Sequence, residues 1–310
     1  MPTPDDPSAT SPSDTSPSDT GASAGTEPEP VERTERRLWL RILLGAVVTL
    51  LVVIVAGTAF IVFGHRDPGE KSRDEAVEDF REGGAQQGSG DGSGDTELVR
   101  PEAGVYSAEA EGEEDVGFGP LNESFGPEAP VTVTHGDNGC FTTRVDLNAN
   151  HWRDWTFCIT DDGVVESGES TFVTREFPGV SFDILTTFVC DPPLLMLHSG
   201  PDTREVSTGS CTGTNDSLEG STDVQVTVST VATGSTEIDG EERESVTVER
   251  ASVLTGFQEG SETIEIVLDK STGLPLSMTF DTDVATESPL GRRDYRDTGS
   301  FTLTSLMPTT

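Results

Sequence analysis

Four oxygen-bearing side chains that could bind a cation stand close together in the sequence: Asp146, Asn148, Asn150 and Asp154. Their spacing matches the opening and the ninth position of a calcium loop, in which carboxylate and amide oxygens coordinate Ca²⁺. Two departures count against that site. His151 stands where the loop needs a glycine, and Phe157 stands where it needs a bidentate glutamate. The alternative, an Asn-rich hairpin turn, is favoured, and we predict no metal site.

Two tryptophans, Trp152 and Trp155, follow this stretch directly. Their unequal spacing predicts a β-bulge that would place both indole rings on one face of a strand. Such a pair could form a platform for a ligand. Two indoles beside a cysteine are more often part of a core, and that interpretation is favoured.

Motifs for catalysis are missing from the sequence. It contains no nucleophile elbow, no zinc-protease helix, no phosphate loop and no dinucleotide fingerprint. His135, His151 and His198 each stand beside Gly, Asn or Ser in an expected turn. A Ser-His-Asp triad assembles in space and leaves no trace in linear order, so a hidden hydrolase stays a minor alternative. We predict a protein without enzymatic activity and without a cofactor.

The chain has four cysteines, all in its C-terminal two thirds: Cys140, Cys158, Cys190 and Cys211. An even number of cysteines on the oxidising side of a membrane indicates disulfides, and the absence of a Cys-x-x-Cys motif argues against a metal site. Three connectivities are possible. We favour Cys140–Cys158 with Cys190–Cys211, because the first pair would flank a symmetrical hairpin that turns through residues 148–151.

Period-two alternation of apolar and polar residues recurs from residue 101 to the C-terminus. Clear examples are Val224 to Val228 and Ile264 to Leu268, with turn signals such as Asp239-Gly240 and Thr272-Gly273 between the segments. Such alternation is typical of antiparallel sheets with one wet face. We predict a mainly β domain with an antiparallel, strongly curved sheet or half-barrel of about ten strands. Val180 to Val189 lacks clear alternation and would be a short helix or a buried strand.

The segment Leu268-Asp269-Lys270-Ser271-Thr272-Gly273-Leu274-Pro275-Leu276 resembles the Asp-x-x-Thr-Gly-Leu-Pro hairpin of lipoprotein-carrier (LolA-like) domains. The resemblance implies a curved antiparallel sheet around a lipid-binding cavity. One face of this hairpin is wholly apolar, and we predict that it binds an apolar ligand unless another element covers it and makes it part of the core; its six residues are Ile264, Ile266, Leu274, Leu276, Met278 and Phe280. The pattern Cys140…Trp152-Arg153-Asp154-Trp155…Cys158 also resembles a group of actinobacterial membrane-anchored envelope proteins.

Residues 42–63 form an uninterrupted apolar stretch without charge. With 1.5 Å of rise per residue a helix of this length spans about 33 Å, enough for a hydrocarbon core of about 30 Å. Arginines crowd the N-terminal flank, so the positive-inside rule places the N-terminus in the cytoplasm and the rest outside. A cleavable signal peptide is the alternative, but it has a shorter leader and a shorter apolar region. We predict a single-pass signal anchor in the cell membrane.

The flanking segments complete the expected organisation. Residues 1–37 are rich in Pro, Ser, Thr and acids and are predicted to be a disordered cytoplasmic tail, with 38–64 as the transmembrane helix. Residues 65–100 are acidic and then Gly/Ser-rich, which predicts a flexible linker in which Arg73 to Glu82 could form a short helix. Residues 101–310 form the extracytoplasmic β domain.

The net charge limits the partners of the protein. The 310 residues include 56 acidic and 19 basic side chains, giving a net charge of −37. This excludes a general affinity for nucleic acid, which needs clustered Lys and Arg. Two function classes remain: a module that binds a hydrophobic or lipid-like ligand, and a non-catalytic structural or protein-interaction module of the cell envelope. An apolar cavity would favour the first class.

Overall fold

The structure is a computed structural model that describes residues 69–83, 98–117, 122–177, 180–199, 206–216, 220–288 and 291–310. All of them belong to one compact unit, Gly57–Thr310. The predicted tail and the predicted apolar span 42–63 lie outside the described residues. Among the described residues, no helix has both the length and the apolar character that crossing a membrane requires.

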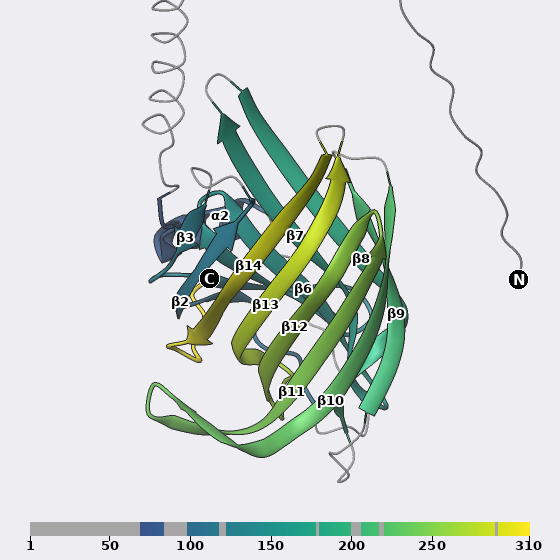
Figure 1. Cartoon of the computed structure of the whole chain (residues 1–310). Coiled ribbons are helices and arrows are strands. Elements are labelled where there is room, and N and C mark those ends of the chain that lie inside the picture. Colours follow the sequence, from purple (N-terminus) through teal and green to yellow (C-terminus); the bar gives the residue numbers. More distant parts are fainter. Residues whose placement is uncertain are drawn as a thin grey trace, which may run out of the picture. The chain divides into compact units, whose positions relative to one another are not determined.

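The described residues form one antiparallel sheet with the order β1-β4-β5-β6-β7-β8-β9-β10-β11-β12-β13-β14-β2-β3. Figure 1 shows the sheet curving strongly, with β12 to β14 in front of β6 to β8. The strands are β1 (Gly104–Tyr106), β2 (Ala108–Asp115), β3 (Glu123–Phe125), β4 (Val131–His135), β5 (Cys140–Asn148), β6 (His151–Thr160), β7 (Gly163–Phe177), β8 (Val180–His198), β9 (Val206–Asn215), β10 (Ser221–Ile238), β11 (Glu241–Gly256), β12 (Gln258–Asp269), β13 (Pro275–Ser288) and β14 (Gly291–Leu303). The predicted mainly β, antiparallel and curved fold is confirmed.

The prediction of about ten strands was wrong, because the sheet has fourteen. Strands β1 and β3 have three residues each, too few to establish a period, and β4 (VTVTH) alternates over five residues only. Strand β9 reads VSTGSCTGTN and its only buried residues are Cys211 and Gly213, so it lacks a hydrophobic period. The segment Val180 to Val189, for which the sequence allowed a short helix or a buried strand, is part of strand β8.

The segment that contains β1 and β2 pairs with both ends of the meander, β4 and β14. Strand β1 pairs with β4, and β2 pairs with β14. Between them, the backbone oxygen of Ser107 accepts a hydrogen bond of 2.8 Å from the backbone N–H of Thr304. One short piece of chain therefore bridges β4, the first strand of the meander, and β14, the last.

The inward face of the sheet carries the hydrophobic core. Side chains that alternate along β10 to β14 are buried there, as the period-two pattern predicted. The six residues of the predicted apolar face, Ile264, Ile266, Leu274, Leu276, Met278 and Phe280, are all members of this core and at most 4% exposed. They pack against one another across β12 and β13.

Both predicted disulfides are present, Cys140–Cys158 and Cys190–Cys211. Each joins residues that face each other in neighbouring strands, β5 with β6 and β8 with β9. The β5–β6 hairpin has the predicted register, and its turn is shorter by one residue at each end, at Ala149 and Asn150.

The turn between β12 and β13 is organised by one carboxylate. Asp269 Oδ1 accepts hydrogen bonds from the backbone N–H groups of Ser271 and Thr272, each 2.9 Å long. Gly273 follows with a φ of +71°, a conformation that glycine adopts at little cost. These contacts explain why Asp, Thr and Gly occur at those positions of the motif.

Part of the predicted linker is folded. Helix α2 (Arg73–Glu82) begins at a capping box of Ser72 and Glu75, and it buries Ala76, Val77 and Phe80 in a small cluster with Val105 of β1. The backbone oxygen of Thr310 accepts a hydrogen bond from Arg81. The expected boundary at residue 101 is therefore too late, because three apolar side chains are enough to dock a well-capped helix onto an existing sheet.

Candidate ligand-binding cavity

Charged side chains occupy part of the inward face of the sheet, next to the hydrophobic core. We call them the ionic cluster: Arg153, Arg175, Arg250, Glu114, Glu123, Glu166, Glu169, Glu262 and Asp297, each at most 7% exposed. They come from β2, β3, β6, β7, β11, β12 and β14. In each long strand, these charged side chains point to the same inward side of the sheet as the buried apolar residues. In β12, for example, Glu262 and Ile264 both point inward.

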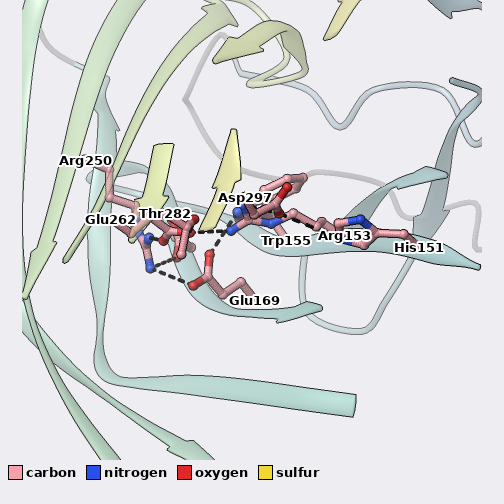
Figure 2. Close-up of polar contacts among 9 residues, drawn as sticks. His151, Arg153, Trp155, Glu169, Arg250, Glu262, Thr282 and Asp297 are labelled. Atoms are coloured by element: carbon pink, nitrogen blue, oxygen red, sulfur yellow. Dashed lines mark hydrogen bonds and ion pairs between the residues drawn. The ribbon is translucent and has the colours of Figure 1, made fainter. Parts of the chain in front are cut away.

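Glu262 lies between two arginines at the centre of the cluster, as Figure 2 shows. Its Oε1 accepts a hydrogen bond of 2.5 Å from Arg153 and one of 2.9 Å from the hydroxyl of Thr282. Its Oε2 accepts a hydrogen bond of 2.8 Å from Arg250. Burial alone would raise the pKa of Glu262, but the two guanidinium groups outweigh it and lower that pKa to about 2.

Arg250 forms ion pairs with three glutamates of the ionic cluster. Its Nη2 lies 3.3 Å from Glu166 and 3.3 Å from Glu169, in addition to the contact with Glu262. Glu169 also accepts a hydrogen bond of 3.0 Å from the indole N–H of Trp155. Burial raises the pKa of Glu166 to about 7, and it raises the pKa of Glu169 as well, although Arg250 opposes both shifts.

His151 lies at the other end of the cluster between two carboxyl groups. Its ring nitrogens are 3.7 Å from Glu114 Oε2 and 3.7 Å from Asp297 Oδ2. Burial lowers the pKa of His151 to about 4, so the imidazole is neutral at pH 7. Arg175 forms ion pairs with Glu114 and with Glu123, the latter at 3.0 Å.

Asp297 is one of the carboxyl groups of the cluster that have an oxygen without a hydrogen-bond partner among the described residues; Glu114 and Glu166 have two such oxygens each. Its Oδ2 lies 3.8 Å from Arg153 Nη1, beyond hydrogen-bonding distance, and its Oδ1 has no hydrogen-bond partner among the described residues. Burial raises the pKa of Asp297 to about 8; Arg153 opposes this, and Glu114 and Glu262 add to it.

A cavity of about 250 Å³ opens on this inward face. Six members of the ionic cluster line it: Glu114, Arg153, Glu169, Arg175, Glu262 and Asp297. The rest of its wall is mainly apolar, with Val173, Ile184, Phe188, Val224, Leu254 and Val284. The arrangement joins an apolar wall to a charged surface within one concave space, which is the usual composition of a small-molecule site.

The predicted apolar ligand face does not line this cavity. Its six residues lie in the filled part of the core, because the side chains of neighbouring strands cover them. Ligand binding through those six residues stays a prediction. The lining of the cavity comes instead mainly from residues of β2 and of β6 to β14.

The prediction that Trp152 and Trp155 share a face was wrong. Strand β6 runs without a bulge between them, so residues an odd number apart point to opposite faces. Trp155 is buried inside. Trp152 lies on the other face, where it stacks on Phe172 at 5.4 Å and lies 4.3 Å from the guanidinium of Arg144.

Two of the four candidate calcium ligands, Asp146 and Asn148, already have partners within the protein. Asp146 forms ion pairs with Arg144 and Lys71, and Asn148 accepts a hydrogen bond from the backbone of Asn150 within the turn. Asp146 and Asp154 line a second cavity, whose wall also includes the cations Lys71 and Arg144. No group of His, Cys, Asp and Glu among the described residues could hold a metal ion.

The histidines differ from the turn positions that the sequence predicted. His151 is a buried strand residue, and His135 ends β4, with its Nε2 2.8 Å from the backbone oxygen of Pro101. His198 ends β8. The three rings lie in different strands.

Sequence reasoning missed the ionic cluster, although a signal existed. Arg250 follows Val246 and Val248 in the buried phase of β11, and Glu262 precedes Ile264 and Ile266 in that of β12. A charged residue in the apolar phase of an amphipathic strand indicates an inward charge. Comparisons of the chain with protein-family models, with curated proteins and with solved structures found no match. The function is therefore argued from the geometry.

Proposed function

We propose that the β domain binds a hydrophobic or lipid-like ligand in this cavity, at the cell envelope. The observation that carries the proposal is the cavity of about 250 Å³ with an apolar wall on the concave face of the sheet. Covering apolar surface contributes roughly 25 cal/mol per Å², so a ligand that fills the space removes its wall from water favourably.

The volume limits the size of the ligand. Typical sites for drug-sized ligands measure about 300–1,000 Å³. A space of about 250 Å³ corresponds to roughly eight water molecules at about 30 Å³ each. The cavity therefore fits a short aliphatic molecule, or one end of a longer chain that leaves through the opening.

A cavity-filling substitution tests the proposal. Leu254 lines the cavity from β11, and its neighbour Val253 points outward and is 56% exposed. We expect the Leu254→Trp variant of the full-length chain, held in phosphatidylcholine nanodiscs, to lose binding of a fluorescent aliphatic probe. Val253→Trp is the matched control and should bind the probe as the wild type does.

Native mass spectrometry of the same samples adds a second readout. Lipid that co-purifies with the wild type and with Val253→Trp, but not with Leu254→Trp, supports the proposal. Equal probe binding by all three proteins would overturn it. If no protein binds any probe, the interaction-module alternative replaces it.

A further inference from the structure

Strand β10 has a free edge along its second half. Its first half, from Ser221 to Ser229, pairs with β9 on one side, and the strand pairs with β11 on the other side almost throughout. From Thr230 to Ile238, β11 is the only strand that pairs with β10 in the part of the chain that the structure describes. Most side chains of this stretch are exposed, Val231 by 52%. Backbone N–H and C=O groups along such an edge can bind a further strand.

The hairpin arm that carries this edge, residues 230–247, is fixed to the domain. Its turn has Asp239 at a φ of +53° and Gly240 at a φ of +78°, as a tight two-residue hairpin turn requires. Ile238 is 3% exposed and belongs to the hydrophobic core. On the β11 side, the backbone oxygen of Glu244 accepts a hydrogen bond of 2.9 Å from the N–H of Lys270. Figure 1 shows the arm reaching beyond the ends of β12 and β13, so the edge is in place before a partner binds.

This edge lacks the features that usually keep strands from pairing with other chains. Short edge strands, charged side chains and proline are such features. The end strands of the sheet, β1 and β3, have three residues each, and the part of β14 that extends beyond β2 carries Arg292, Arg293 and Asp294. Between Val224 and Thr236, by contrast, there is no charged residue and no proline, although 24% of the chain is charged. A bulge at residue 231 interrupts only the beginning of the free stretch.

We propose that this edge pairs with the same edge of a second copy of the chain, in antiparallel register about a twofold axis. Twofold dimers are the commonest assemblies of identical chains. The free stretch is centred at Gly234, so the axis lies at Gly234 or at its neighbour Ser235. Glu237 of one copy then lies opposite Val231 or Thr233 of the other copy, and both of these residues are uncharged. The two acidic turns lie at opposite ends of the contact, so no like charges face each other in the ladder.

The side chains of the edge favour a strand of their own kind. Thr, Val, Ala, Gly and Ser make up the stretch from Thr230 to Thr236. With the axis at Gly234, Thr233 of each copy lies opposite Ser235 of the other, and hydroxyl pairs of this type stabilise antiparallel ladders. The net charge of −37 on each chain opposes association at longer range. Salt screens that repulsion, so the dimer should become more stable as salt increases.

Paired charge substitutions test the contact. The space around Gly234 is open, with no atom within 4 Å of an added Cβ, and Thr233 is exposed, so a single copy accommodates longer side chains at both positions. In the double variant Thr233→Glu with Gly234→Glu, the new carboxylates face each other if the axis is at Gly234, and they face Glu237 if it is at Ser235. The double variant Thr233→Gln with Gly234→Gln has nearly the same shape without the charge and is the matched control.

Sedimentation velocity of the full-length chain in dodecyl maltoside micelles measures the dimer. We expect the wild type and the double glutamine variant to dimerise, and the double glutamate variant to dimerise at least about tenfold more weakly, because like charges opposite each other destabilise a ladder. The wild-type dimer should strengthen between about 0.05 M and 0.5 M salt. Circular dichroism checks that both double variants stay folded.

Disulfide crosslinking locates the contact. All four natural cysteines are in disulfides, so an introduced cysteine is the only free thiol. Under mild oxidation, Gly234→Cys or Ser235→Cys, whichever lies at the axis, should crosslink two copies, because directly opposite residues are close enough for a disulfide. Thr263→Cys is the control: it is exposed on β12, which is paired with β11 and β13 on its two sides.

Each outcome bears on the proposal. A wild type that stays monomeric would overturn it and would leave the edge to an extended segment of another protein. Equal dimerisation of the two double variants would overturn the proposed register and with it the contact. If neither Gly234→Cys nor Ser235→Cys crosslinks faster than Thr263→Cys, any dimer forms elsewhere and the proposal is also overturned.

Discussion

Replacing Arg250 by methionine should destabilise the domain strongly. The side chain is 1% exposed, and its Nη atoms lie 2.8 Å from Glu262, 3.3 Å from Glu166 and 3.3 Å from Glu169. Removing one partner from a buried ion pair costs about 3–5 kcal/mol, because the remaining charges stay buried without compensation. Glu262 keeps its bond to Arg153, so the loss falls mainly on the other two glutamates.

The loss of stability in the Arg250→Met variant should become larger as pH rises. Burial already raises the pKa of Glu166 to about 7 and also raises that of Glu169, whereas an unfolded glutamate has a pKa of about 4.3. Without Arg250 both pKa values rise further. The folded state then holds protons that the unfolded state has released, so the variant loses stability as pH rises from about 4.5. The deficit should be smaller at pH 5 than at pH 8.

Thermal unfolding of the full-length chain, followed by tryptophan fluorescence, measures the effect. A domain of this size loses about 2–4 °C of Tm per kcal/mol, so Arg250→Met should lower Tm by about 6–20 °C at pH 8. The control is Arg292→Met, which removes an exposed ion pair with Glu259 and should cost about 1 kcal/mol or less. A variant as stable as the wild type, or a deficit equal at both pH values, would refute the reasoning.

Three further predictions follow from single features of the structure. Asp297→Asn should flatten the fall in stability that the wild type shows as pH rises from about 4 to 8, because the raised pKa of about 8 keeps a proton on the folded carboxyl group; an unchanged slope of Tm against pH would contradict this. Asp269→Ala should cost about 1–3 kcal/mol in urea unfolding, because two backbone N–H groups lose their acceptor, and a loss below 0.5 kcal/mol would show that water replaces it. Protease added to intact cells should remove the β domain and leave the N-terminal tail, and survival of the domain would contradict the predicted topology.

Local patterns predicted the parts of the fold that local chemistry decides. Period-two alternation identified the long strands, and the pairing of cysteines followed from a hairpin whose two ends face each other. The phase of alternation also identified the buried residues of β12 and β13. Simple alternation along β6 places Trp152 and Trp155 on opposite faces, as the structure does. The prediction failed because it assumed a bulge between them.

The ionic cluster could not be assembled from the sequence, because its partners are set by curvature and by register between distant strands. Arg153 in β6 bonds to Glu262 in β12, and these strands are not neighbours in the sheet. The alternation shows that both side chains point inward, but it does not show which inward charges meet. The position of the cavity beside the filled core depends on the same curvature.

The pairing of β2 with β14 has a consequence for how the protein is made. Ala110 lies opposite Phe301, so the strand that emerges early from the ribosome finds its partner only when synthesis is almost complete. Contacts between such distant residues slow folding, because a large loop has to close before they form. Until then β2 and the growing end of the meander both expose unpaired backbone groups, which invite pairing with other chains. Glu109, Glu111 and Glu113 alternate along β2 and place like charges on this unpaired edge. Two copies of the edge would therefore repel each other.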